Sequence, residues 1–174
     1  MRARWSVRSR AWVVALGLLA LAGCATGGGL VNDDATGSGY CAQQAATGPV
    51  LIGLSTLRNE GTSVAEVTDV TLIDPTDGIE LVGAYLVPEA DTPSNGQPFV
   101  MPDDPVMTVE PGGTVFVVVG IGLRSGVHAA RADGVRVTYR VDGRESHVRT
   151  RLWMQTSEAG APCDADWTPP GSDD

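Results

Sequence analysis

Residues 135–154 read VRVTYRVDGRESHVRTRLWM, and this stretch decides the fold. Apolar and polar residues alternate from Val135 to Asp142, which is the period-two pattern of a half-buried β-strand. The dipeptide Asp142-Gly143 favours the two-residue type I′ turn of a β-hairpin. The return strand continues the inward-facing set with Val148, Thr150, Leu152 and Met154.

A two-residue turn also fixes which residues of this hairpin face one another. It pairs Arg140 with Glu145, Thr138 with His147, and Val137 with Val148. A slip by one residue would move the apolar set to the solvent face, so the pattern specifies the register.

Upstream of the hairpin, strand-sized segments are separated by turn-forming Gly, Pro, Asn and Asp residues. The parity of the apolar residues shifts between Val67 and Val70, which predicts a β-bulge. Residues 115–119 read VFVVV, apolar on both faces, and predict a central buried strand. The expected strands span residues 50–58, 64–73, 79–87, 106–109 and 114–123.

These patterns predict an all-β fold, a single antiparallel β-sandwich of about seven strands over residues 49–157. Two turns, Asn59-Glu60-Gly61 and Glu110-Pro111-Gly112-Gly113-Thr114, stand before the second strand and before the central one. With these turns the segment resembles the immunoglobulin-like domains of exported bacterial proteins. The resemblance implies an immunoglobulin-like scaffold, which hosts many unrelated functions.

The amino-terminal residues have the layout of an export signal. Arginines at positions 2, 4, 8 and 10 precede the apolar run 11–22, which is too short to span a bilayer of ~30 Å. The run ends in Leu21-Ala22-Gly23-Cys24, which matches the lipobox, so this end resembles a bacterial prolipoprotein. The resemblance implies that residues 1–23 are a signal peptide and that Cys24 carries the lipid. The alternative is an ordinary secreted protein that is cut nearby.

Lipidation would place the chain on the extracytoplasmic face of a bacterial cell membrane. Two or more acyl chains hold a protein firmly, whereas one gives marginal binding. The sequence contains no lysine and is rich in Ala, Gly, Val, Asp and Pro, a composition that resembles actinobacterial proteins.

Residues 24–48 are rich in small and polar side chains, which favours a disordered linker that reaches ~25–30 Å from the anchor. Residues 158–174 form an acidic, Pro-rich tail. Of the three cysteines, Cys24 is assigned to the lipid, and the other two are left as a pair. Since exported compartments are oxidising, we expect a disulfide between Cys41 and Cys163; two independent thiols are the alternative.

The charge argues against nucleic-acid binding. The formal net charge is −9, and removal of residues 1–23 would remove four arginines and no acid, leaving −13. An acidic body of this kind supplies no general field that displaces phosphate counterions. The seven arginines of residues 124–151 nevertheless outnumber the three acids there, so the carboxyl-terminal part is locally basic.

Catalytic signatures are absent from the sequence. The only histidines are His128 and His147, and nucleophile-elbow, zinc-protease and phosphate-loop motifs do not occur. We therefore predict a non-enzymatic protein without catalytic residues, metal or cofactor. Two metal alternatives stay open. Copper would use Met and His side chains, and calcium would use the aspartates of turns. The copper donors would be Met101, Met107, His128, His147 and Met154, and the calcium donors Asp74 with Asp77 or Asp103 with Asp104.

The outward face of the hairpin is the predicted interaction surface, since arginine and tryptophan are enriched at interface anchors. Its members are Arg136, Arg140, His147, Arg149, Arg151 and Trp153. The surface suits an anionic envelope component, namely a wall polymer, a lipid headgroup or an acidic protein. The alternative is a solvated sheet face with internal pairs such as Arg140–Glu145. The sequence therefore predicts a membrane-anchored binding or accessory module, with a copper chaperone or a structural spacer as alternatives, and it leaves the oligomeric state open.

Overall fold

The computed structural model describes residues 28–34, 38–44, 49–91 and 107–163. These residues form eleven β-strands and one short 3-10 turn, η1 (Glu89–Asp91), without an α-helix among them. The all-β prediction is confirmed. In chain order the strands are β1 (Leu30–Asn32), β2 (Ser38–Gln43), β3 (Val50–Asn59), β4 (Ala65–Leu72), β5 (Ile79–Pro88), β6 (Thr108–Val109), β7 (Thr114–Leu123), β8 (Ala129–Ala132), β9 (Val135–Val141), β10 (Arg144–Arg149) and β11 (Leu152–Ser157).

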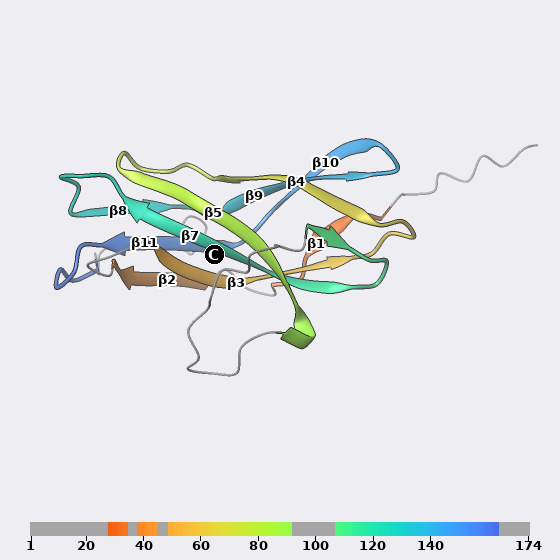
Figure 1. The fold of residues 1–174 in the computed structure, drawn as a ribbon, viewed down its shortest axis with the longest axis horizontal. Coiled ribbons are helices and arrows are strands. Elements are labelled where there is room, and N and C mark those ends of the chain that lie inside the picture. Colours follow the sequence, from red (N-terminus) through yellow and green to blue (C-terminus); the bar gives the residue numbers. More distant parts are fainter. Residues whose placement is uncertain (1–27, 35–37, 45–48, 92–106, 164–174) are drawn as a thin grey trace, which may run out of the picture.

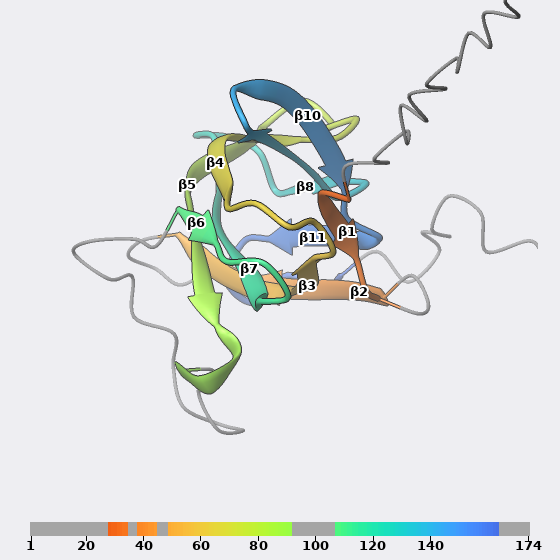
Figure 2. The ribbon, with the colours of Figure 1, turned by 90° about the vertical axis from the view of Figure 1, so that its right-hand side faces the viewer.

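The strands make three sheets with the orders β1-β3-β7-β5, β10-β9-β4-β6 and β2-β11-β8. Seen along the body, β4 and β10 lie on one side of a common interior and β2 and β3 on the other (Figure 2). The β9–β10 hairpin and β1 lie at one end of the long axis, whereas β8 and the ends of β2 and β11 lie at the other (Figure 1). We call these the hairpin end and the disulfide end.

One apolar cluster joins all three sheets. Its fully buried members include Leu57 of β3, Ile121 of β7, Val137 of β9 and Met154 of β11. Each of these side chains contributes roughly 1.5–3 kcal/mol by burial, which makes this cluster the main source of stability.

β7 is the central strand of its sheet and is apolar on both faces, as residues 115–119 predict. Val117 and Val119 enter the main cluster, whereas Val118 packs with Tyr85 and Val87 of β5 on the opposite face. Burial raises the pKa of the Tyr85 phenol, whose hydroxyl oxygen has no hydrogen-bond partner in the described structure. A strand with both faces covered explains why its sequence lacks alternation.

The hairpin prediction is confirmed at residue level. β9 and β10 pair with Arg140 opposite Glu145, Thr138 opposite His147, and Val137 opposite Val148. Asp142 and Gly143 have φ angles of 51° and 74°, as a type I′ turn requires at both central positions. The β4 bulge is also present, because the register with β9 shifts between Val67 and Asp69.

The single antiparallel sandwich of about seven strands needs correction, because eleven strands form three sheets and β2 pairs with β11 in parallel. The break comes at Thr150, whose Oγ1 accepts a hydrogen bond from the Val135 amide at 3.0 Å. β10 ends before Thr150 and β11 begins after it, so the return strand passes from one sheet to another. The immunoglobulin-like assignment itself stays a prediction.

The disordered linker over residues 24–48 is wrong for the residues that form β1 and β2. Leu30 is 4% exposed and pairs opposite Asn59, so β1 is an edge strand of the β3 sheet. β2 is held by β11 over six residue pairs. Both strands are stabilised by contacts with distant residues, which local composition does not reveal.

Asn59 is a buried polar residue at the hairpin end whose side chain links the turn after β3 to β6. Its Nδ2 donates to the carbonyl oxygens of Ser63 at 2.9 Å and Val109 at 2.8 Å, and its Oδ1 accepts from the Gly61 amide. The residue is 0% exposed. Removal of its amide would therefore leave these three backbone groups without a hydrogen-bond partner and without access to bulk water.

We therefore expect Asn59→Ala to lower the free energy of unfolding by about 3 kcal/mol. Chemical denaturation under non-reducing conditions measures the change. The control is Thr71→Ala at an exposed position of β4, which should stay within about 0.5 kcal/mol of the wild type. Equal stability of the two variants would show that the Asn59 amide does not join these segments.

Candidate functional site

The predicted arginine surface is exposed. Arg136 and Arg140 of β9, His147 and Arg149 of β10, and Arg151 in the connection to β11 all have exposed side chains. Strand alternation put these residues on the face opposite the apolar core, so this part of the prediction agrees with the structure.

Acidic neighbours balance much of the positive charge on this face. The Arg140 Nη2 lies 3.6 Å from Glu145 Oε2, and Arg140 also stands opposite Glu66 of β4. The Arg149 Nη2 lies 3.9 Å from Asp74 Oδ2. Exposed ion pairs of this kind are worth only about 0–1 kcal/mol, so their effect is on the surface charge rather than on stability.

Arg136 is placed differently. It stands directly opposite Arg149 across the hairpin, and like charges in that position repel. No ion pair joins the Arg136 side chain to another residue of the described ranges. An anionic partner would relieve this repulsion, which makes the Arg136–Arg149 pair the strongest part of the predicted surface.

Trp153 lies apart from the other members of the predicted surface. It lies in β11 of another sheet, opposite Gly39 of β2, and its ring fills the space that a β-carbon on Gly39 would need. The indole is therefore half-buried against β2. Trp153 keeps the outward parity, because its neighbours Leu152 and Met154 are buried in the core, but its ring lies over Gly39 of β2, a distant contact that sequence reasoning did not include.

The predicted disulfide between Cys41 and Cys163 is present, with the two Cα atoms 6.1 Å apart and a sequence separation of 122. Side chains next to it support the same junction. Gln43 Nε2 donates to the Ala161 carbonyl at 3.0 Å, and Gln44 Oε1 accepts from the Leu123 amide at 3.1 Å. Residues assigned to the tail thus bind β2 at the disulfide end.

The described residues expected for copper are not brought together. Met154 is fully buried in the core, and Met107 is partly buried against the same cluster. His147 lies on β10, whereas His128 precedes β8 and its Nδ1 is 2.9 Å from Glu158 Oε2. No group of three His, Cys, Asp or Glu side chains suited to a metal occurs in the described ranges.

The two calcium candidates within the described ranges are explained by local structure. Asp74 has a φ of 43° and occupies the turn between β4 and β5 together with the exposed Asp77. Asp is a frequent turn former because it tolerates this backbone conformation. Met101, Asp103 and Asp104 lie outside the described residues.

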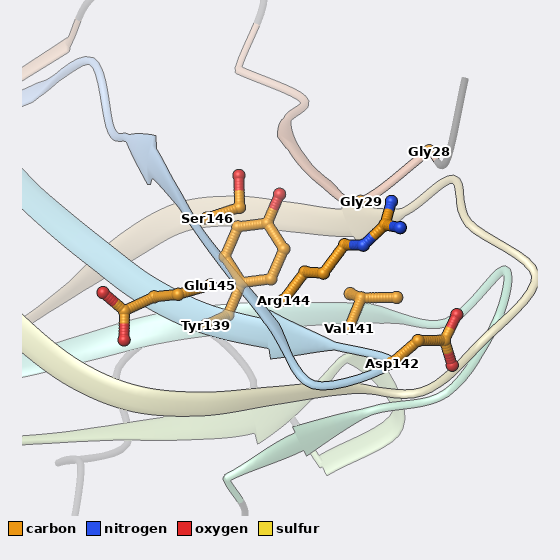
Figure 3. Close-up of a pocket in the computed structure, with 8 residues that line it drawn as sticks. All are labelled: Gly28, Gly29, Tyr139, Val141, Asp142, Arg144, Glu145 and Ser146. Carbon is orange, nitrogen blue, oxygen red and sulfur yellow. The ribbon is translucent and has the colours of Figure 1, made fainter. Parts of the chain in front are cut away.

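A pocket at the hairpin end was missed by sequence reasoning (Figure 3). Its cavity volume is about 520 Å³, within the ~300–1,000 Å³ of small-molecule sites. Its lining residues are Gly28, Gly29, Tyr139, Val141, Asp142, Arg144, Glu145 and Ser146. The available signal was strand alternation, which puts Arg144 and Ser146 on the same face as Val148 and opposite Val141 and Tyr139.

The chain before β1 closes one side of this pocket. The Glu60 amide donates to the Gly29 carbonyl at 3.1 Å, and a β-carbon on Gly29 would collide with the Tyr139 hydroxyl. A glycine is required at this position because the backbone passes directly over the tyrosine. The Tyr139 hydroxyl, the Ser146 hydroxyl and the Arg144 guanidinium lie on the same side of the hairpin (Figure 3).

Arg58 ties the same chain segment to β3. Its guanidinium lies 3.3 Å from Asp33 Oδ2 and 2.7 Å from Glu60 Oε1. The hydrogen bond to Asp33, with the charges of Asp33 and Glu60, raises the pKa of Arg58. Asp33 and Glu60 are therefore both paired with the same cation, Arg58.

Cys24 and the apolar run 11–22 lie outside the described residues. Within the ranges that are described, no helix has the length and apolar character to cross a bilayer.

Comparison with known proteins identifies no family. No protein-family model and no curated protein matches the chain. Part of the solved structure of Vibrio cholerae VesB protease is similar, with a TM-score of 0.38 and 9% sequence identity. The match covers 76% of this chain and 32% of that one, so the chain spans about a third of the protease structure.

We expect the double variant Cys41→Ser/Cys163→Ser to lose about 3–5 kcal/mol of unfolding free energy, because the bridge closes a loop of more than a hundred residues. Denaturant unfolding of the oxidised wild type and the variant measures the loss. Reduced wild type is the matched control and should behave like the variant. Two free thiols in the unreduced wild type, seen by mass spectrometry, would contradict the pairing.

Proposed function

We propose that this chain is an extracytoplasmic lipoprotein, anchored through Cys24, whose β-body is a non-enzymatic binding or accessory module. The observation that carries the proposal is the lipobox Leu21-Ala22-Gly23-Cys24, placed at the end of an apolar run and four positions before Gly28. Gly28 already contributes to the folded body, as one of the residues that line the pocket.

The spacing between the proposed anchor and the body is short. Consecutive Cα atoms advance at most ~3.6 Å per residue, so the Cα atoms of Cys24 and Gly28 are at most about 14 Å apart. This replaces the ~25–30 Å reach expected for a linker that continued to residue 48. An anchor at Cys24 would therefore hold the hairpin end of the body close to the lipid headgroups.

Two surfaces support binding as the role of the body. The exposed Arg136–Arg149 pair suits an anionic envelope component. The pocket at the hairpin end is a second concave surface, half open to solvent and lined by polar side chains that a small polar ligand can reach. An immunoglobulin-like scaffold remains part of this proposal, supported by its turn motifs alone.

Lipidation is tested by metabolic labelling with an alkyne fatty acid. The wild-type protein should take up the label, and Cys24→Ala should lose it completely, because the thiol is the acceptor. Cys41→Ala is the matched cysteine control and should keep the label. An unlabelled mature wild-type protein would overturn the anchor.

The arginine surface is tested by charge reversal. We expect Arg136→Glu/Arg149→Glu to lose at least one partner that crosslinks to the wild type in native membranes, because both cations face the same site. Arg124→Glu/Arg131→Glu, with the same charge change near the disulfide end, is the control and should keep that partner. An unchanged set of crosslinked partners would leave the face as solvated sheet surface and favour the structural spacer.

A further inference from the structure

We propose that the free edge of β10 pairs with the same edge of a second copy of this chain, in an antiparallel register centred on Ser146. The four-stranded sheet that contains β10 would then continue into the sheet of the second copy across a two-fold axis. The pairing depends on β10 and not on the proposed anchor at Cys24.

The backbone of β10 alternates between β9 and a free edge. β10 is the terminal strand of its sheet and lies at the outer margin of the body (Figure 2). The Thr150 amide donates to the Val135 carbonyl at 2.9 Å, so the even-numbered residues of this segment point their backbone groups toward β9. Residues 145, 147 and 149 therefore point theirs toward the free edge. The Arg149 carbonyl accepts from Asn32 Nδ2 at 3.4 Å on that edge, which agrees with this alternation.

The edge groups of Glu145 and His147 are open to a partner. No hydrogen bond from another described residue occupies their edge amide or carbonyl groups. Both side chains are exposed, and so are Arg144 and Ser146 on the other face of the strand. Two N–H and two C=O groups are thus available to an added strand.

The open groups restrict the register of two identical strands. In an antiparallel pair, edge residues must face edge residues, which leaves two-fold registers centred on Glu145, Ser146 or His147. Centring on Glu145 would place two carboxylates directly opposite each other, which is destabilising. Centring on His147 would require the Arg149 edge, which Asn32 already contacts. The register centred on Ser146 uses only the open groups and forms four backbone hydrogen bonds.

The outer face of β10 is self-complementary in this register, which favours a second copy as the partner. Glu145 stands opposite His147 of the second copy, whose imidazole donates a hydrogen bond in either protonation state. The Glu145 carboxylate lies 3.6 Å from Arg140 through one oxygen, and its side chain is 61% exposed, so it can meet donors on both sides.

The same register brings a carboxylate toward the cations of the hairpin. Arg149 of one copy lies diagonal to Glu145 of the other, within reach of long side chains. This carboxylate offsets the repulsion between Arg149 and Arg136, which stand opposite each other in β10 and β9. A charged edge usually prevents self-association because like charges meet, whereas here unlike side chains stand directly opposite each other.

Disulfide trapping in the full chain, expressed in its host, tests the register. Ser146→Cys would place the added thiol opposite its own copy, at a Cα separation of about 4.5 Å, which lies within the ~4.4–6.8 Å range of disulfides. We expect mild oxidation to give at least about tenfold more covalent dimer than in the unmutated chain, because pairing holds the two thiols at high effective concentration. Non-reducing electrophoresis measures the dimer.

Arg144→Cys is the matched control, because this residue is also exposed on the same face of β10. In the proposed register it lies four positions, or roughly 13 Å, from the equivalent residue of the second copy. It should give no more dimer than the unmutated chain.

A second variant tests the backbone bonds. His147→Pro, added to Ser146→Cys, removes an edge amide of each copy and leaves the amides that point toward β9 in place. We expect it to lower the dimer yield at least about tenfold, because two hydrogen bonds are lost across the axis. His147→Ala keeps the amide and should lose less.

Three results would overturn the proposal. A monomeric Ser146→Cys chain would exclude the pairing, and equal dimer yields from Ser146→Cys and Arg144→Cys would exclude the register. A Ser146→Cys crosslink to a different protein, without a dimer, would exclude a second copy as the partner of this edge.

Discussion

The antiparallel contact between residues 28–34 and the end of β3 is the constraint on which the hairpin end depends. Asp33 donates its amide to the Thr56 carbonyl at 2.9 Å, and Glu60 donates to Gly29 at 3.1 Å. These bonds bring the backbone of Gly29 over Tyr139 and so form one side of the pocket. The same bonds bring the folded body to within four positions of Cys24, so the proposed membrane orientation follows from them.

Local sequence patterns predicted those parts of the fold that local physics decides. The β9–β10 hairpin was predictable because its alternation, its Asp142-Gly143 turn and its register agree with one another. β1 and β2 were not, since β1 has three residues and β2 is held by a partner strand and a disulfide more than a hundred residues away. Such distant contacts leave no periodic signal in the segment itself.

The surfaces divide in the same way, into features that local alternation predicts and features that depend on distant contacts. Alternation predicted that Arg136 and Arg149 are exposed, yet it gave no sign that Glu66 and Asp74 from the β4 side would balance the neighbouring charge. The pocket forms only where β10 meets the chain before β1, so its residues come from two segments far apart in sequence. Strand alternation puts Arg144 on the same face as Val148, but it does not reveal the backbone before β1 that makes this face one side of a pocket.

Hydrogen exchange of the backbone amides tests the central contact most directly. We predict that the Asp33 and Glu60 amides exchange at least about 100-fold more slowly than unprotected amides, because both are bonded across the β1–β3 junction. Exchange of both amides at the unprotected rate, while the amides of β7 remain protected, would contradict it. Residues 28–34 would then belong to a linker, and neither the pocket nor the short distance to Cys24 would remain.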